Sequence, residues 1–124
     1  KMGIIHNGEV AYMSLKENEM RRYGFQQGDS EGFVNYPLTV KKMKMSAMFL
    51  ATRKFIRVSL RSRGAVDVNV FARRYFEGGG HANAAGGKSF RTMEETIEHF
   101  RTSVEEYFAE IEGTNAVATE GETK

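Results

Sequence analysis

Several residue types that support common functional sites are absent or scarce in this 124-residue chain. It contains no cysteine, so it forms neither a disulfide framework nor a thiolate metal site. No apolar run approaches the roughly 18 residues that a membrane span requires, and no secretory hydrophobic region lies near the start. With 40% hydrophobic and 27% charged residues, the composition is typical of a soluble globular domain. We therefore expect a single domain, in the cytoplasm, with no membrane partner.

Residues for autonomous catalysis are also few. The three histidines, His6, His81 and His99, lie far apart in the sequence, and the only aspartates are Asp29 and Asp67. A two-metal hydrolytic centre needs several carboxylate and histidine ligands around ions about 3.5–4 Å apart. The chain has no Gly-x-Ser-x-Gly nucleophile elbow and no Walker or dinucleotide fingerprint. We expect no active site and no metal site within this chain alone.

Charge is segregated along the sequence although the net charge is only +2. Between Lys41 and Arg74 there are ten basic residues and one acid, Asp67. From Thr92 onward nine glutamates face only two basic residues. A basic middle segment favours an anionic partner.

Periodicity predicts a mixed fold of strands and helices. We expect two strand-like runs, over 43–52 and 55–62, to pair as a hairpin through Arg53-Lys54, and two amphipathic helices have start signals at Asp67 and at the Thr92/Glu95 capping box. The predicted elements are strands over 9–15, 43–52, 55–62 and 84–90, helices over 17–23, 67–77 and 92–113, and a loop with one helical turn over 25–39. The expected fold class is α/β, α+β-like: a mixed sheet of four to five strands with a central hairpin, packed by about three helices.

The strand over 55–62 has two chemically different faces. Ile56, Val58 and Leu60 fall on one face, and Arg57, Ser59 and Arg61 fall on the other. The apolar face is expected to pack into the core. The other face presents guanidinium groups to a ligand or to solvent.

The run Gly78-Gly79-Gly80-His81-Ala82-Asn83-Ala84-Ala85-Gly86-Gly87 follows that basic segment. Glycine permits positive φ and close approach of other groups, and successive exposed N–H groups attract anions. With His81 at the rim and Arg61 and Arg63 on a neighbouring strand, the pattern favours a phosphate-bearing ligand. The alternative is a helix C-cap and a tight turn with no ligand. Asn69 and Asn83 contact a sugar or base in the first interpretation and brace the loop in the second.

The motif Gly-Gly-Gly-His-x-x-Ala-Ala-Gly at 78–86 closely resembles the DHH-associated C-terminal domain of the DHH phosphoesterases, as do Ser59-Leu60-Arg61-Ser62-Arg63-Gly64 and Val66-Asp67-Val68-Asn69 before it. The nearest branch is that of the bacterial nanoRNases and pAp phosphatases, which is related to exopolyphosphatases. Residues 30–35 also resemble the lead-in segment of that branch. The resemblance covers roughly residues 9–112, and the Arg-Ser-x-Gly plus Gly-Gly-Gly-His pair is fairly specific.

The resemblance implies that this domain binds substrate while a separate N-terminal DHH domain, with two Mn²⁺ ions, hydrolyses short oligoribonucleotides, 3′-phosphoadenosine 5′-phosphate or dinucleotides. Arg61 and His81 would contact a substrate phosphate, and Asn69 and Asn83 are weaker candidates. Ala82 stands where relatives often carry lysine. The remaining implied site residues, which line the phosphate site, are Ser62, Arg63, Gly79 and Gly80.

No Asp-His-His segment occurs in this sequence, and Lys1 precedes Met2. We therefore expect the substrate-binding part of a larger enzyme, inactive alone, with 1–8 as a linker, 9–112 as the domain and 113–124 as a disordered tail. Two alternatives stay open: a nucleic-acid-binding module without catalytic role, as in alanyl-tRNA synthetases, and a polyphosphate or pyrophosphate hydrolase. Whether the intact protein forms a homodimer is also open.

Overall fold

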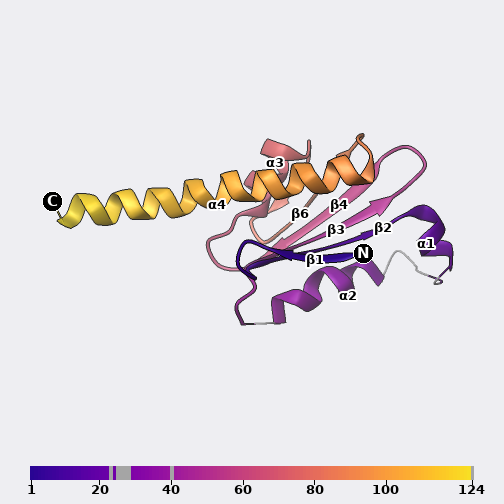
Figure 1. Ribbon diagram of the computed structural model, residues 1–124, viewed down its shortest axis with the longest axis horizontal. Helices are drawn as coiled ribbons and strands as arrows, with labels where there is room; N and C mark the ends of the chain where they lie inside the picture. The colour runs from indigo at the N-terminus through magenta and orange to yellow at the C-terminus, as the bar shows by residue number, and fades with distance from the viewer. Residues whose placement is uncertain (23, 25–28, 40, 124) are drawn as a thin grey trace.

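The computed structural model describes residues 1–22, 24, 29–39 and 41–123 and contains one six-stranded sheet with helices on both faces (Figure 1). The elements follow in the order β1 (Met2–Ile5), β2 (Val10–Leu15), α1 (Glu17–Arg22), α2 (Asp29–Asn35), a 3₁₀ helix η1 (Tyr36–Thr39), β3 (Met45–Ala51), β4 (Ile56–Ser62), α3 (Val68–Tyr75), β5 (Gly79–His81), β6 (Ala84–Ser89) and α4 (Met93–Thr123).

The strand order is β1-β2-β3-β4-β6-β5. Strands β2 and β3 are parallel, and every other neighbouring pair is antiparallel. A parallel pair needs a long crossover, and the segment that contains α1 and α2 provides it. The predicted mixed sheet and its central hairpin, β3–β4, are confirmed.

The main core lies between the sheet and the layer of α3 and α4 (Figure 1). Val58 and Leu60 of β4 pack there with Phe71 of α3 and with Phe100 and Val104 of α4. Removing each such side chain from water contributes about 1.5–3 kcal/mol. The predicted apolar face of β4 is therefore the core face.

The opposite face of the sheet is only partly covered. Val34 of α2 packs on Met48 and Leu50 of β3 in a smaller cluster, and the Ser46 hydroxyl donates a hydrogen bond to the Val34 carbonyl. The outward side chains of β4 and β6 farther along the sheet, such as Arg57 and Lys88, are exposed. This open half of the face is where the candidate site lies.

The helix starts follow the sequence signals. The Asp67 carboxylate accepts a hydrogen bond from Val70 N at 3.0 Å, as an N-cap does. Thr92 and Glu95 form a reciprocal capping box, each side chain accepting the other residue's N–H at 3.1 Å. Helix α3 ends at Tyr75 with Phe76 as its C-cap, before the first glycine, and Glu77 takes a positive φ of 49°.

Three expectations differ from the structure. Residues 2–5, expected in a linker, form the edge strand β1, which pairs with β2 because its extended backbone completes the open edge of that strand. The loop expected over 25–39 contains α2 and η1 within its described part, residues 29–39, because burial of Val34 outweighs the turn-forming residues. Helix α4 does not end at Gly113 but continues to Thr123. The disorder expected for 113–124 stays a prediction.

In the described part of the chain, no helix combines the length and the apolar character needed to cross a membrane.

Candidate functional site

A shallow depression of about 720 Å³ lies on the open face, over β4, β6 and β5. Its floor is built by paired residues of β4 and β6. Register sets Arg57 opposite Lys88, Ser59 opposite Gly86, and Arg61 opposite Ala84. The predicted polar face of β4 is thus one side of this floor.

Cations lie at both ends of the floor. Arg57 and Lys88 share one row, and Arg61 lies four residues farther along β4, which corresponds to about 13 Å of extended strand. Among the described residues, no carboxylate lies within ion-pair distance of Arg57 or Lys88, whereas Glu77 supplies a negative charge at the rim. A guanidinium binds phosphate through a planar pair of donors. The floor can therefore receive two anionic groups, one at each end.

The glycines of the motif allow backbones to pack closely. A Cβ at Gly78 would lie 1.9 Å from the Gly86 carbonyl oxygen, and one at Gly87 would lie 2.5 Å from the Phe76 carbonyl oxygen. The run forms β5, a short turn and β6 rather than one extended concave loop. These glycines also leave the middle of the floor without bulky side chains, so a ligand can approach the strands.

Asn69 braces the glycine run from α3. Its Oδ1 accepts a hydrogen bond from Gly80 N at 2.9 Å. The backbone N–H of Gly80, which the sequence analysis suggested for phosphate binding, therefore already has a hydrogen-bond partner inside the domain. Gly79 and Gly80 line the depression.

Ser62 and Asn83 lie away from this floor. Ser62 is 5% exposed, and its hydroxyl donates to the Val66 carbonyl at 2.6 Å. Asn83 Nδ2 in turn donates to Ser62 Oγ at 3.0 Å. Both residues tie the β5–β6 turn to the β4–α3 loop, which matches the bracing interpretation of Asn83.

The structure separates the two arginines that the sequence grouped together. Arg61 lines the floor and donates from Nη1 to the Leu60 carbonyl at 2.9 Å. Arg63 donates from Nε to the Met43 carbonyl and lines a different depression beside Lys42 and Lys44. Arg61 is therefore the stronger candidate for the floor.

His81 ends β5 and is exposed. Register places it opposite Ala84, which is opposite Arg61, so the three residues form one row across β5, β6 and β4. Two strand spacings, about 10 Å, separate the backbones of His81 and Arg61. Ala84 lines the depression, whereas its row neighbour His81 lies outside the lining.

Sequence reasoning did not select Arg57, Lys88 or Phe55 as site residues, although all three line the depression. Alternation had placed Arg57 on the right face. The signal that was missing is the β4–β6 register, which brings Lys88 beside Arg57 from a strand 31 residues later.

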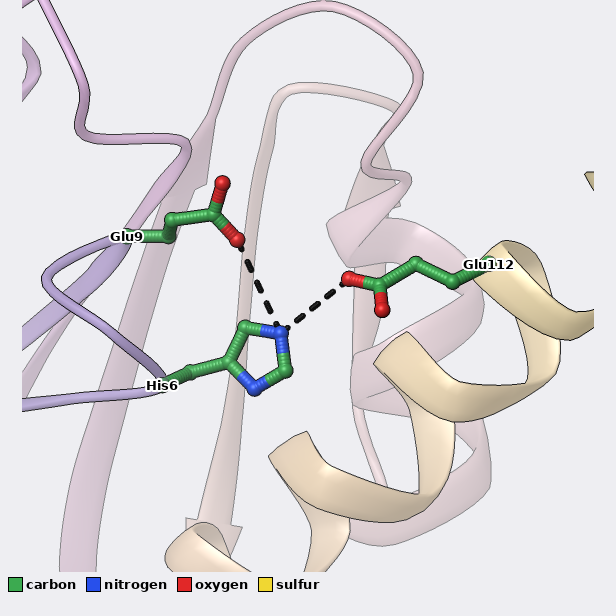
Figure 2. Close-up of side chains that lie close together, drawn as sticks. All are labelled: His6, Glu9 and Glu112. Atoms are coloured by element: carbon green, nitrogen blue, oxygen red, sulfur yellow. Dashed lines mark hydrogen bonds and ion pairs between the residues drawn. The ribbon is translucent and has the colours of Figure 1, made fainter.

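A second polar cluster lies at the other edge of the sheet, where the β1–β2 turn meets α4 (Figure 2). His6 Nε2 lies 3.1 Å from Glu112 Oε1 and 3.6 Å from Glu9 Oε1, and His6 Nδ1 lies 3.3 Å from Glu105 Oε1. Lys44 Nζ pairs with Glu9 at 2.9 Å. Burial lowers the pKa of His6, but hydrogen bonds to Glu112 and Glu105 outweigh it and raise the pKa above its usual value. The cluster fastens α4 to the β1–β2 turn as an ion-pair network.

His6, Glu9 and Glu112 also form the one group of potential metal ligands found among the described residues, with donor atoms within 4.8 Å of one another. Three donors do not make a two-ion hydrolytic centre, which needs several ligands for each ion. The resemblance assigns the pair of manganese ions to a separate DHH domain, and this group of described residues does not supply the ligands for such a pair.

Comparisons with known proteins give the family of this chain. The model of the DHHA1 domain family matches residues 7–110. A 3′,5′-cyclic-nucleotide phosphodiesterase of Helicobacter pylori is 30% identical over 112 residues, which are 77% of this chain and 31% of the relative. An exopolyphosphatase-related protein of Bacteroides fragilis is 39% identical with a TM-score of 0.80, over 86% of this chain and 31% of that structure.

A pGpG-specific phosphodiesterase of Vibrio cholerae shares the fold at 17% identity, with a TM-score of 0.54 over 82% of this chain and 33% of that structure. The chain thus spans about a third of the length of the relatives that it matches. By family match and by structure, it belongs to the DHHA1 domain family, the DHH-associated domain of the DHH-family phosphoesterases.

Proposed function

We propose that this domain binds the phosphate groups of a nucleotide substrate, which a DHH domain of the same protein hydrolyses. The observation that carries the proposal is the floor itself, with cations at both ends and a glycine-rich middle. A phosphodiester substrate carries several negative charges at fixed spacing, and a rigid sheet holds complementary charges at fixed spacing.

The substrate class is a short oligoribonucleotide, pAp or a dinucleotide. Arg57 and Lys88 hold one phosphate group, and Arg61 holds another, with His81 donating to it from edge strand β5, two strands away. Holding the substrate in a fixed position converts a bimolecular reaction into an effectively unimolecular one. We assign the hydrolytic step to manganese ions on the DHH domain, because the described residues of this chain hold no two-ion centre.

The experiment compares intact protein with its Arg57→Ala and Arg61→Ala variants on di- to pentaribonucleotides and on pAp, with added Mn²⁺. Both variants are expected to lose kcat/KM. Arg53→Ala is the matched control, because Arg53 is an exposed arginine in the β3–β4 turn that pairs with Glu17 at 3.6 Å. If both floor variants had the same kcat/KM as the wild type, the proposal would lose its basis.

A second candidate is hydrolysis of polyphosphate or pyrophosphate. It is favoured by the exopolyphosphatase-related protein that is 39% identical and by the repeated cations of the floor. Polyphosphate assayed beside the nucleotides separates the two, because a nucleotide enzyme prefers substrates that carry bases.

A further inference from the structure

The cationic floor ends in two aromatic rings that no part of the phosphate-binding argument uses. Phe55 lines the depression beside Arg57. Phe90 lies outside that lining, in an adjoining depression of about 380 Å³ that Phe55 also lines. Phe55 directly precedes β4 and Phe90 directly follows β6, so both lie just beyond the last paired residues of these strands, Ile56 and Ser89. The ring centroids of Phe55 and Phe90 lie 6.1 Å apart at an interplanar angle of 54°.

Both rings are carried on anchored backbone. Thr52 N donates to the Phe55 carbonyl at 2.8 Å, and Phe55 N donates to Thr52 Oγ1 at 3.2 Å. Phe90 follows Ser89, whose buried hydroxyl lies 2.7 Å from Thr96 Oγ1 on α4. The backbone that carries each ring is therefore held in place without a ligand, which limits the ordering of backbone that binding requires.

Phe90 is 68% exposed. Single exposed apolar side chains are common and need no explanation. This ring, however, is paired with a second aromatic ring at the end of a charged depression. Lys88 Nζ also lies 4.8 Å from the centroid of the Phe55 ring, which is cation–π distance. The Lys88 ammonium thus lies over one face of the Phe55 ring, and the Phe90 ring is the more exposed of the two.

We propose that Phe55 and Phe90 form a stacking surface for a nucleobase, while Lys88 and Arg57 hold the phosphate attached to the same nucleotide. The aromatic row and the Arg57–Lys88 row are two residues apart, about 6.6 Å along the strands. That spacing is comparable with the distance between the base and the phosphate of one nucleotide. This inference rests on the proposed function and deepens it by naming the side chains that would recognise the base of the nucleotide.

Stacking on phenylalanine accepts every base, because each base has a π face. The surface therefore selects nucleotides over bare phosphate chains without selecting a sequence. It also fixes polarity, since one end of the floor takes a base and the other end, at Arg61, takes phosphate.

The test uses intact protein with Phe90→Ala and Phe90→Trp, and Ile4→Ala as the control. Ile4 is 64% exposed on β1, at the opposite edge of the sheet. The first readout is quenching of 2-aminopurine fluorescence in a dinucleotide, which reports stacking directly and needs no turnover. The second is competitive inhibition by AMP and by ribose 5-phosphate, which differ in the base.

Phe90→Ala is expected to reduce the quenching and to weaken AMP inhibition by about 5- to 100-fold, the range for a lost base–aromatic stack. Phe90→Trp restores both, and ribose 5-phosphate inhibits all variants equally. Unchanged quenching in Phe90→Ala, or equal weakening of AMP and ribose 5-phosphate, would overturn the stacking surface. If Arg61→Ala also leaves nucleotide hydrolysis at the wild-type rate, the proposed function fails with it. If Arg61→Ala is impaired, only the stacking inference fails.

Discussion

The sharpest stability prediction concerns Gly78, the first residue of the glycine run. We expect Gly78→Ala to destabilise the fold strongly, because the new Cβ would lie 1.9 Å from the Gly86 carbonyl oxygen, 2.6 Å from Gly87 Cα and 2.8 Å from the Gly86 carbonyl carbon. All three are backbone atoms of β6, so no side chain can rotate away.

Inserting a group into packed surroundings costs about 1–3 kcal/mol, and the rigidity of these neighbours places Gly78→Ala at the upper end, about 3 kcal/mol. For a domain of this size each kcal/mol lowers Tm by about 4 °C, so a fall of about 12 °C is expected. Urea unfolding followed by circular dichroism gives the free energy, and a thermal scan gives Tm.

Gly32→Ala is the matched control. Gly32 lies in α2, its φ is not positive, and a Cβ there would meet nothing within 4 Å. Alanine in a helix is favoured over glycine by about 0.5–1 kcal/mol, so this variant should be slightly more stable than wild type. If Gly78→Ala unfolds like wild type but loses substrate binding, the glycine serves the ligand and not the packing, and our reasoning is refuted.

Three further predictions follow from other parts of the structure. In the intact protein, Arg61→Ala or His81→Ala should lower kcat/KM, with a rise of about 2–4 kcal/mol in the corresponding activation free energy, as expected for a lost charged hydrogen bond to a reacting phosphate. Steady-state kinetics of both variants beside Arg53→Ala checks this. Because the pKa of His6 is raised in the fold, its ion pairs stabilise the domain fully below about pH 6.5 and progressively less as pH rises through the folded pKa. The excess unfolding free energy of wild type over His6→Gln should therefore be larger at pH 6 than at pH 8.5, and an excess independent of pH would contradict the network. Asp67→Ala should cost about 1 kcal/mol of unfolding free energy through loss of the α3 N-cap, measurable by urea titration, and an unchanged urea midpoint would count against the cap.

The elements that local sequence specifies were predicted well. Alternation placed the apolar residues of β4 on the core face and Arg57 and Arg61 on the other, and the structure agrees. Asp67 and the Thr92/Glu95 pair marked the starts of α3 and α4, because capping depends only on neighbouring residues. Edge strand β1 was not predicted, because its four residues are too few to show a recognisable pattern.

The site needed information that no local pattern contains. Helix α2 forms because Val34 packs on β3, a contact with residues that follow it in the chain. Lys88 joins Arg57 only through the register of β4 with β6. Arg61 and Arg63 are two residues apart and looked equivalent, yet the end of β4 sends Arg63 to a different depression.

The half-covered face of the sheet has a consequence for how this domain responds to its surroundings. Arg57 and Lys88 are exposed, so dissolved ions reach them freely and the Debye length at physiological ionic strength is about 8 Å. An anion bound to this floor therefore competes with chloride for the cations, and dissolved salt screens its attraction to them. Affinity of the domain for phosphate groups should fall steeply as sodium chloride is added, whereas a ligand enclosed between two protein surfaces would be far less sensitive to salt.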